Sequence, residues 1–353
     1  MGKIYTALGL MTGTSMDGVD VSIIKSDGIS HFTNVLDEFY QLSDDLQSRL
    51  FSLRDKILSK ADLIKFLDEI KLLEREITIF HSEVVQDISS KYKENIDLIG
   101  FHGQTIFHDS KIKITKQLGD GNLLSQLTKK IVVYDFRQKD LQNGGQGAPL
   151  TPIFHNMLSN KIFDKKENEI ANIINIGGIT NITLTSNDND KFTKEIKAMD
   201  IAPGNCLIDQ WVRKNSDKKF DKDGLIGKSG KINELILNQA IENFAFSNYD
   251  KSLDIKDFDI SFVKGLSLED GCATITEFTA YLISEGIKFS NKESNHKLNK
   301  YLICGGGRKN KFLIDSIKRY LRNSENIILE LIDLYKYDGD YIESQAFGYL
   351  ATR

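Results

Sequence analysis

The stretch GLMTGTSMDGVD, residues 9–20, combines groups that can hold phosphate with the sequence of a tight turn. It separates two apolar runs, and Asp17-Gly18 is a typical hairpin dipeptide. Glycines let backbone N–H groups approach anionic oxygens closely, and the hydroxyls of Thr14 and Ser15 add donors. The pattern favours a phosphate-binding turn and a purely structural hairpin about equally. The residues that we predict to contact phosphate are Gly13, Thr14, Ser15, Met16, Asp17, Gly18, Val19 and Asp20.

Two more glycine turns follow strand-like runs, NIGGITN at 175–181 and CGGGRKN at 304–310. One such turn is a weak signal, but three in order along one chain favour a nucleotide site. The first two turns would hold phosphates, and the third, which opens a helix, would face the nucleoside. Asp17 and Asp20 are candidates to approach Mg²⁺ through water, although Asp20 could equally be an edge charge. The further residues predicted to bind ATP are Gly177, Gly178, Asn181, Gly305, Gly306, Gly307 and Asn310.

The elements that must position these turns alternate between strands and helices, which predicts an α/β fold. Apolar residues recur at helical spacing in LIKFLDEIKLLEREITIF, which predicts one long amphipathic helix within a helical region from 43 to 92. Strands are expected at 3–11, 18–26, 30–40, 96–101, 130–136, 170–176, 179–185 and 300–305. Further helices are expected at 204–215, 230–244, 268–287 and 309–322.

Length and composition set limits on the protein class. A chain of 353 residues exceeds what one core usually fills, so we expect two domains with a cleft between them. A net charge of −4 without a basic block argues against nucleic acid as a partner. Three scattered cysteines fit a reducing compartment, and no run approaches the roughly 18 apolar residues of a membrane span. These features predict a soluble, cytoplasmic protein without a membrane partner.

In order and content, the three turns resemble the sugar kinase, Hsp70 and actin superfamily, and within it the anhydro-N-acetylmuramic acid kinases. The resemblance runs nearly end to end and is most specific in GGQGAPL. The other segments that carry it are GFHGQTIFH (100–108), QLGDGN (117–122), MDIAPGNCLIDQW (199–211), FDKDG (220–224) and IESQAFGYLA (342–351). It implies a two-lobed actin-like ATPase (ribonuclease H-like) fold with an interdomain cleft. We place an N-terminal lobe at 1–134, joined by the C-terminal helix 345–353, and a C-terminal lobe at 135–344.

The family implies an ATP- and Mg²⁺-dependent enzyme of peptidoglycan recycling. It would open the 1,6-anhydro ring of a sugar and phosphorylate its 6-oxygen. Opening the ring with water needs a carboxylate that takes the water's proton. Asp200, at the end of the strand-like KAMD, is the best-placed base, and its structural alternative is to cap the helix that begins near 204.

Four more side chains are candidates for the sugar site. His102 and Gln104 could bind hydroxyl groups, or His102 could be a satisfied core imidazole. Arg137 could hold the carboxylate of the sugar's lactyl group with two hydrogen bonds, or pair with Asp140 on the surface. Glu343 could face the sugar or complement the dipole of the last helix.

The chain departs from the family pattern at several positions. Ile201-Ala202 replaces the usual Thr-Gly after the base, Asp254-Ile255 replaces a Gly-Arg pair, and Arg308 replaces a small residue. Three alternatives therefore stay open: a kinase of another anhydro sugar such as levoglucosan, an actin- or chaperone-like ATPase with a protein partner, and a family member without activity. The sequence leaves the preferred sugar and a homodimeric state open.

Overall fold

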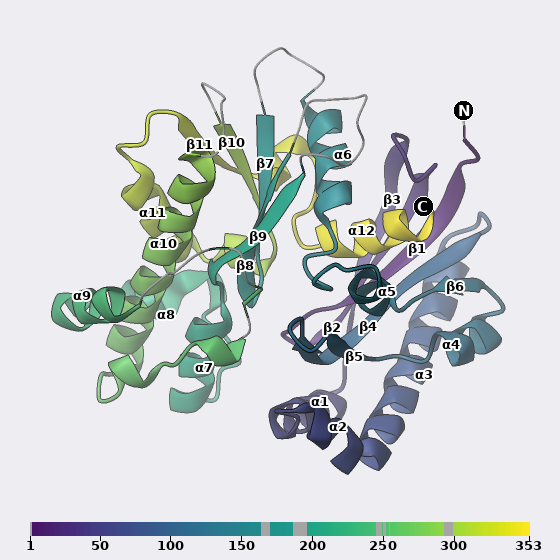
Figure 1. The fold of residues 1–353 in the computed structure, drawn as a ribbon, viewed down its shortest axis with the longest axis horizontal. Coiled ribbons are helices and arrows are strands. Elements are labelled where there is room, and N and C mark those ends of the chain that lie inside the picture. The colour runs from purple at the N-terminus through teal and green to yellow at the C-terminus, as the bar shows by residue number, and fades with distance from the viewer. Residues whose placement is uncertain are drawn as a thin grey trace. The chain divides into compact units, whose positions relative to one another are not determined.

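The chain forms two compact units in the computed structural model (Figure 1). Unit 1 comprises Met1–Phe154 and Tyr341–Arg353, and unit 2 comprises His155–Asp340. The residues that the structure describes are 2–163, 170–185, 196–244, 249, 252–253, 255–292 and 299–353.

The division between the units falls after Phe154, whereas the sequence led us to place it near 135. Aromatic contacts explain the difference. The ring centroids of Phe136 and Phe347 are 5.3 Å apart, and those of Phe154 and Phe32 are 5.1 Å apart. Segment 135–154 therefore packs with unit 1. The C-terminal segment also belongs there from Tyr341 onward, which places Glu343 in unit 1 rather than in the second lobe.

Unit 1 is built on a mixed sheet in the order β3-β2-β1-β4-β5, with β6 also paired to β4. The first three strands are antiparallel, and β4 runs parallel to β1. Its strands are β1 Tyr5–Thr12, β2 Gly18–Ser26, β3 Phe32–Gln41, β4 Leu98–Asp109, β5 Ile114–Leu118 and β6 Ile131–Val133. Its helices are α1 Asp44–Lys56, α2 Lys60–Lys65, α3 Leu67–Lys91, α4 Gly121–Thr128, α5 Phe136–Gln142 and α12 Ile342–Ala351.

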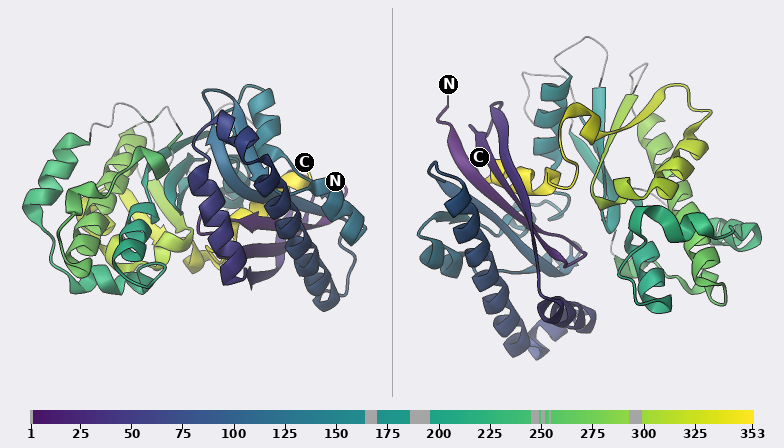
Figure 2. Two further views of the ribbon diagram at one scale, coloured as in Figure 1. Left: turned by 90° about the horizontal axis from the view of Figure 1, so that it is seen from below. Right: turned by 180° about the vertical axis from the view of Figure 1, so that it is seen from behind.

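Helices α3 and α12 cover opposite faces of this sheet. Leu8 and Leu10 share a core cluster with Val84 and Ile88 of α3. Gly9 lies between them in β1 and faces the other way, as alternation along a strand requires. A Cβ on Gly9 would lie 1.8 Å from the carbonyl oxygen of Ser344, so α12 can pack this closely only against glycine. Figure 2 shows α12, in yellow, packed on the N-terminal strands of this sheet.

Unit 2 repeats the same plan with the sheet order β11-β10-β7-β8-β9. Its first three strands are again antiparallel, and β10 runs parallel to β7. Helix α6, Pro152–Ile162, contains the division between the units. The other strands and helices are β7 Ile170–Ile176, β8 Ile179–Leu184, β9 Lys197–Pro203, α7 Cys206–Asn215, α8 Leu225–Ser229, α9 Glu234–Asn243, α10 Leu268–Lys292, β10 Asn299–Cys304, α11 Lys311–Leu321 and β11 Ile327–Leu331. Short 3₁₀ helices lie at Lys222–Gly224, Ile255–Asp257, Ser261–Val263, Gly306–Lys309 and Ile332–Tyr335.

The sheet of unit 2 also has helices on both faces. Ile182 of β8 joins a cluster with Cys272 and Ile283 of α10. The next residue, Thr183, hydrogen-bonds His155 of α6 through atoms 2.8 Å apart. The strand order of both sheets, three antiparallel strands followed by a strand parallel to the first, is the ribonuclease H-like arrangement of actin-like ATPases. The predicted fold class is therefore confirmed in each unit.

Most predicted elements are confirmed within a few residues. The prediction of one long amphipathic helix is wrong in one respect. The backbone leaves helical geometry at Phe66, and this break divides the predicted helix into α2 and α3. Within the part of the chain that is described, no helix combines the length and the apolar character that a membrane span requires.

Candidate functional site

The opening turn connects β1 to β2, and its glycines Gly13 and Gly18 have different roles. A Cβ on Gly18 would lie 2.3 Å from the Phe39 ring, so packing requires glycine there. A Cβ on Gly13 would have Ser15 Oγ as its nearest atom, 3.8 Å away. Space beside Gly13 is therefore open to a ligand, as the phosphate prediction requires. Met16 and Val19 are fully buried, which leaves only their backbone for such contacts.

Polar side chains hold this turn in place. Ser15 Oγ donates to Asp17 Oδ1 over 2.5 Å on the exposed side. Thr12 Oγ1 lies 3.2 Å from Nε2 of the buried His81, whose Nδ1 lies 2.6 Å from the carbonyl oxygen of Ile77. A carbonyl only accepts, so Nδ1 carries the hydrogen, and the Thr12 hydroxyl donates to Nε2. Helix α3 thus fixes the direction of the Thr12 hydroxyl.

The second turn, between β7 and β8, presents consecutive backbone donors. The carbonyl oxygens of Gly177 and Gly178 accept from the N–H groups of Asn205 and Gly204, each over 2.8 Å. The C=O and N–H of a planar trans peptide point in opposite directions, so the N–H groups of Gly178 and Ile179 point away from segment 204–205. Two adjacent donors with one direction are suited to an anion.

The third turn, Gly305–Gly307, is packed against the end of β7. Gly305 has φ 81°, and a Cβ there would lie 2.2 Å from Asn175 Oδ1. A Cβ on Gly307 would lie 2.2 Å from Ile176 Cγ2, whereas one on Gly306 would have its nearest atom 3.9 Å away. Gly306 is thus the position with room for a ligand. Asn310 Oδ1 accepts from Leu313 N over 2.9 Å and caps α11, so that oxygen is occupied.

Asp200 lies in β9 and is 8% exposed. Its Oδ2 accepts from the Leu253 N–H over 2.8 Å and from Ser252 Oγ over 3.1 Å. The capping alternative is wrong, since α7 begins at Cys206 with Asn205 as its N-cap residue. The contacts hold the carboxylate in one orientation.

A β-bulge interrupts the regular pairing of β8 and β9 next to Asp200. Asn181 of β8 pairs with Asp200, but Thr180 pairs with Ala202, so Ile201 is the extra residue. Directly paired residues on antiparallel strands share a face, which brings Asn181 and Asp200 together. Asn181 Oδ1 is buried and has no hydrogen-bond partner among the described residues.

The two residues after Asp200 that depart from the family pattern lie in the hydrophobic core. Ile201 and Ala202 are fully buried. The Ile201 side chain packs beside Gly286 of α10, where a Cβ would lie 2.6 Å from Ile201 Cβ. Asp254 lies outside the described residues, while Ile255 begins a 3₁₀ turn.

His102 and Arg137 form a pair in unit 1. Arg137 Nε donates to His102 Nε2 over 2.9 Å, and His102 Nδ1 lies 2.7 Å from the carbonyl oxygen of Gly103. His102 Nε2 therefore accepts, and Nδ1 carries the hydrogen. Burial, together with the charge of Arg137, holds the pKa of His102 well below its ordinary value of 6.5. His102 is thus a neutral acceptor that orients Arg137.

The alternative that Arg137 pairs with Asp140 on the surface does not match the hydrogen bonds of either residue. Arg137 Nη1 donates to the Gly147 carbonyl oxygen over 2.8 Å, within the GGQGAPL motif. Asp140 instead accepts from the Gly147 N–H, also over 2.8 Å. The motif therefore supports the guanidinium from one side while His102 supports it from the other.

Gln104 and Glu343 complete the predicted sugar set. Gln104 is 1% exposed, and its Oε1 has no hydrogen-bond partner among the described residues. Glu343 is half-buried in the first turn of α12, four residues before Phe347, whose ring contacts those of His102 and Phe136. Residues i and i+4 share a helix face, so Glu343 lies on the face of α12 that meets His102. His102 therefore contacts Phe347, Arg137 contacts His102, and Glu343 lies on the same face of α12 as Phe347.

Comparison with known proteins decides the family. The model of the family described as anhydro-N-acetylmuramic acid kinase matches residues 5–353. The chain belongs to the anhydro-N-acetylmuramic acid kinase family. A relative of that name from Pelagibacter ubique is 52% identical over 100% of this chain and 92% of its own length. Those from Zymomonas mobilis and Agrobacterium fabrum are 36% and 34% identical over 98% and 100% of this chain and 92% and 93% of their own lengths. The predicted family is therefore confirmed.

Sequence reasoning missed the residues that position the predicted ones. Ser252 and Leu253 hold Asp200, and His81 holds Thr12. Near Ser252, the sequence drew attention only to the replaced pair Asp254-Ile255. Nothing in the sequence links His81 to Thr12, because the two residues are 69 positions apart and meet only where α3 packs on the sheet.

Buried neutral histidines make the stability of this family member depend on pH. Burial lowers the pKa of His81 to about 4 and that of His155 to about 3, from 6.5. The unfolded chain therefore binds more protons between these values and 6.5, and stability falls as pH falls through that window. We expect a loss of roughly 2 kcal/mol per buried histidine between pH 7 and pH 5 in denaturant titrations. His155→Gln should make stability depend less on pH over this window. A stability that does not change with pH in the wild-type chain would contradict this.

Proposed function

We propose that the chain uses ATP to phosphorylate O6 of 1,6-anhydro-N-acetylmuramic acid while water opens the anhydro ring at C1. The products are N-acetylmuramic acid 6-phosphate and ADP, and the setting is peptidoglycan recycling in the cytoplasm. Family membership supports the class of reaction. The observation that carries the mechanism is the buried, doubly hydrogen-bonded carboxylate of Asp200.

Asp200 acts as the general base. Its carboxylate takes a proton from water as the water oxygen forms a bond to C1. The C1–O6 bond breaks, its electron pair stays on O6, and O6 bonds to the γ-phosphorus as ADP leaves. The donors on Oδ2 orient the carboxylate, so the reacting water meets a fixed acceptor.

The glycine turns hold the nucleotide. Open space at Gly13, Gly177 and Gly306 allows phosphates to approach the backbone, and the adjacent N–H groups of Gly178 and Ile179 donate to them. Among the described residues no cluster of three or more metal-binding side chains occurs. Asp17 and Asp20 would hold Mg²⁺ through water rather than by direct ligation. When bound, Mg²⁺ neutralises charge that develops on the phosphates.

The sugar is held in unit 1 by Gln104, Arg137 and Glu343, with His102 as the residue that orients Arg137. The buried Oε1 of Gln104 accepts from a sugar hydroxyl or amide group. Arg137 pairs with the lactyl carboxylate, which is the group that separates this sugar from levoglucosan.

Arg137→Ala should therefore lower kcat/KM for anhydro-N-acetylmuramic acid at least about tenfold more than for levoglucosan. The comparison uses initial rates of ADP release with both sugars and the same enzyme preparation. Any loss of folded protein then lowers both rates equally and leaves their ratio unchanged. Arg137→Lys should recover little, because an ammonium group cannot make the planar two-bond pair. Equal losses with both sugars would remove Arg137 from the lactyl site.

One experiment tests the function as a whole. ADP release is followed with ATP, Mg²⁺ and anhydro-N-acetylmuramic acid, and the product is formed in ¹⁸O-labelled water. We expect sugar-dependent ADP release and the label on C1. Sugar-independent turnover with label in free phosphate would instead identify an ATPase, and no turnover would identify an inactive family member. A size measurement on the same sample tests the homodimer, which stays a prediction.

A further inference from the structure

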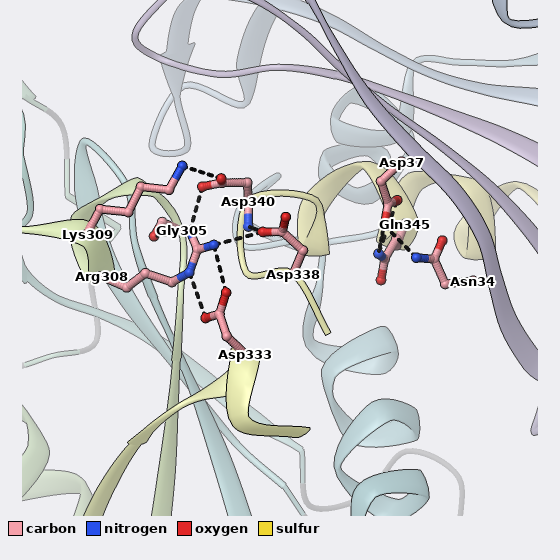
Figure 3. Close-up of polar contacts among 9 residues, drawn as sticks. All are labelled: Asn34, Asp37, Gly305, Arg308, Lys309, Asp333, Asp338, Asp340 and Gln345. Carbon is pink, nitrogen blue, oxygen red and sulfur yellow. Dashed lines mark hydrogen bonds and ion pairs between the residues drawn. The ribbon is translucent and has the colours of Figure 1, made fainter. Parts of the chain in front are cut away.

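Arg308 directly follows the Gly305–Gly307 turn, and its guanidinium is enclosed by three carboxylates (Figure 3). Its side chain is 6% exposed. Nε and Nη2 donate to the two oxygens of Asp333 over 2.8 and 3.0 Å. Nη2 also donates to Asp338 Oδ1 over 2.8 Å, and Nη1 donates to Asp340 Oδ1 over 2.5 Å.

The remaining contact reaches the turn itself. Nη1 donates to the Gly305 carbonyl oxygen over 3.3 Å, so all five N–H groups of the guanidinium are used. The Gly305 N–H in turn donates to the Gly339 carbonyl oxygen over 2.8 Å. A Cβ on Gly339 would lie 2.5 Å from Arg308 Nε, so segment 338–340 can close over Arg308 only with glycine at its centre. Both polar groups of Gly305 are therefore tied to this cluster.

Charge balance makes the cluster depend on Arg308. Three carboxylates face Arg308 and Lys309, which pairs with Asp340. Burial alone would raise the pKa of Asp333 and Asp340, but the hydrogen bonds from Arg308 hold both below the ordinary value of 3.8. Without Arg308, three charged groups would face one lysine, and their repulsion would release segment 333–340.

The segment that Arg308 holds is the last part of unit 2. Unit 1 resumes at Tyr341, the residue after Asp340, and α12 with Glu343 begins at Ile342. The glycine turn and the point where the chain leaves unit 2 are thus fastened by one side chain.

We propose that Arg308 is a positioning residue for the nucleotide, fixing the backbone of the Gly305–Gly307 turn against segment 333–340. The proposal rests on the proposed function, which places ATP at this turn. Gly305 has a positive φ of 81°, which favours glycine. Its N–H donates to the Gly339 carbonyl oxygen, and its own carbonyl oxygen accepts from both the guanidinium and the backbone N–H of Arg308. Loss of Arg308 lets the turn relax and misplaces the groups that meet the nucleotide. None of the four predicted sugar residues is among the hydrogen-bond partners of Arg308.

The test compares Arg308→Met and Arg308→Lys with the full-length wild-type chain. Calorimetric titration with a non-hydrolysable ATP analogue, well below the melting temperature of each variant, gives the Kd of folded protein. Steady-state rates give KM separately for ATP and for the anhydro sugar. We expect Arg308→Met to raise Kd and KM for ATP at least about tenfold while KM for the sugar changes less than about twofold. Arg308→Lys should weaken ATP binding by a smaller factor, because an ammonium group cannot bridge three carboxylates and the Gly305 carbonyl.

Arg319→Met is the matched control, because it also removes an arginine that pairs with a carboxylate, Glu277, in unit 2. It should lower the melting temperature and leave the Kd for ATP within about twofold, as expected for contacts that only stabilise the fold. Arg308 variants that bind the analogue as tightly as wild type would overturn the positioning role alone. Should Arg308→Met fail to fold, Arg308→Lys decides the question. A wild-type chain that binds no nucleotide would overturn the proposed function along with it.

Discussion

Asp200→Asn is expected to bind ATP and the sugar normally and to lose sugar-dependent ADP release by at least about 100-fold. Asparagine keeps the size of the side chain, and its amide oxygen still accepts from the Leu253 N–H, so β9 retains its geometry. What is lost is the ability to take a proton from water. The measurement is kcat by coupled assay, together with separate binding titrations for ATP and the sugar.

Asp221→Asn is the matched control for this prediction. Asp221 is also buried in unit 2, but its oxygens accept from the backbone N–H groups of Ile226 and Gly227, over 2.7 and 3.0 Å. Its substitution should lower the melting temperature and leave the rate per folded molecule near normal. Near-normal turnover by Asp200→Asn would mean that the base lies elsewhere.

Gly13→Val is expected to abolish measurable ATP binding in a protein that stays folded. The structure leaves 3.8 Å between a Cβ at this position and its nearest neighbour, so the side chain fits the fold and occupies the space that phosphate needs. Ligand-induced stabilisation tests this: ATP at about 100 times its Kd should stabilise wild type by about 2.7 kcal/mol and should not stabilise the variant.

The neighbouring Gly18 supplies the opposite control. A Cβ there would lie 2.3 Å from the Phe39 ring and 2.4 Å from the Tyr40 carbonyl oxygen, so Gly18→Ala should destabilise unit 1 even without ligand. A folded Gly13→Val protein with wild-type affinity for ATP would refute a phosphate role for the opening turn.

The sequence predicted the strands and helices that carry a clear pattern of apolar residues within their own length. β1, β2, β7 and β10 were found because they are apolar runs bounded by glycine turns. β5 and β11 were missed, since each has only five residues and none of those in β11 is fully buried. The break at Phe66 was missed because the apolar periodicity continues through it while the backbone does not.

The sequence predicted those site residues that lie within a recognisable motif. Asp200, Arg137 and the glycine turns stand in such motifs. The partners of Asp200 lie 52 and 53 positions away, and the carboxylates around Arg308 lie 25 to 32 positions away. Such partners are set by strand order and loop packing, which no local pattern encodes. Glycines in the motifs also proved to differ, because Gly305 and Gly307 are required by packing and Gly306 is not.

Helix α12 has a consequence for how the chain matures on the ribosome. Residues 1–154 leave the ribosome first, yet the surface around Gly9 stays uncovered until α12 has been made. His155–Asp340 is continuous in sequence, so this later-made half is the first that can finish folding. The N-terminal half therefore remains an incomplete layered structure until α12 packs on it.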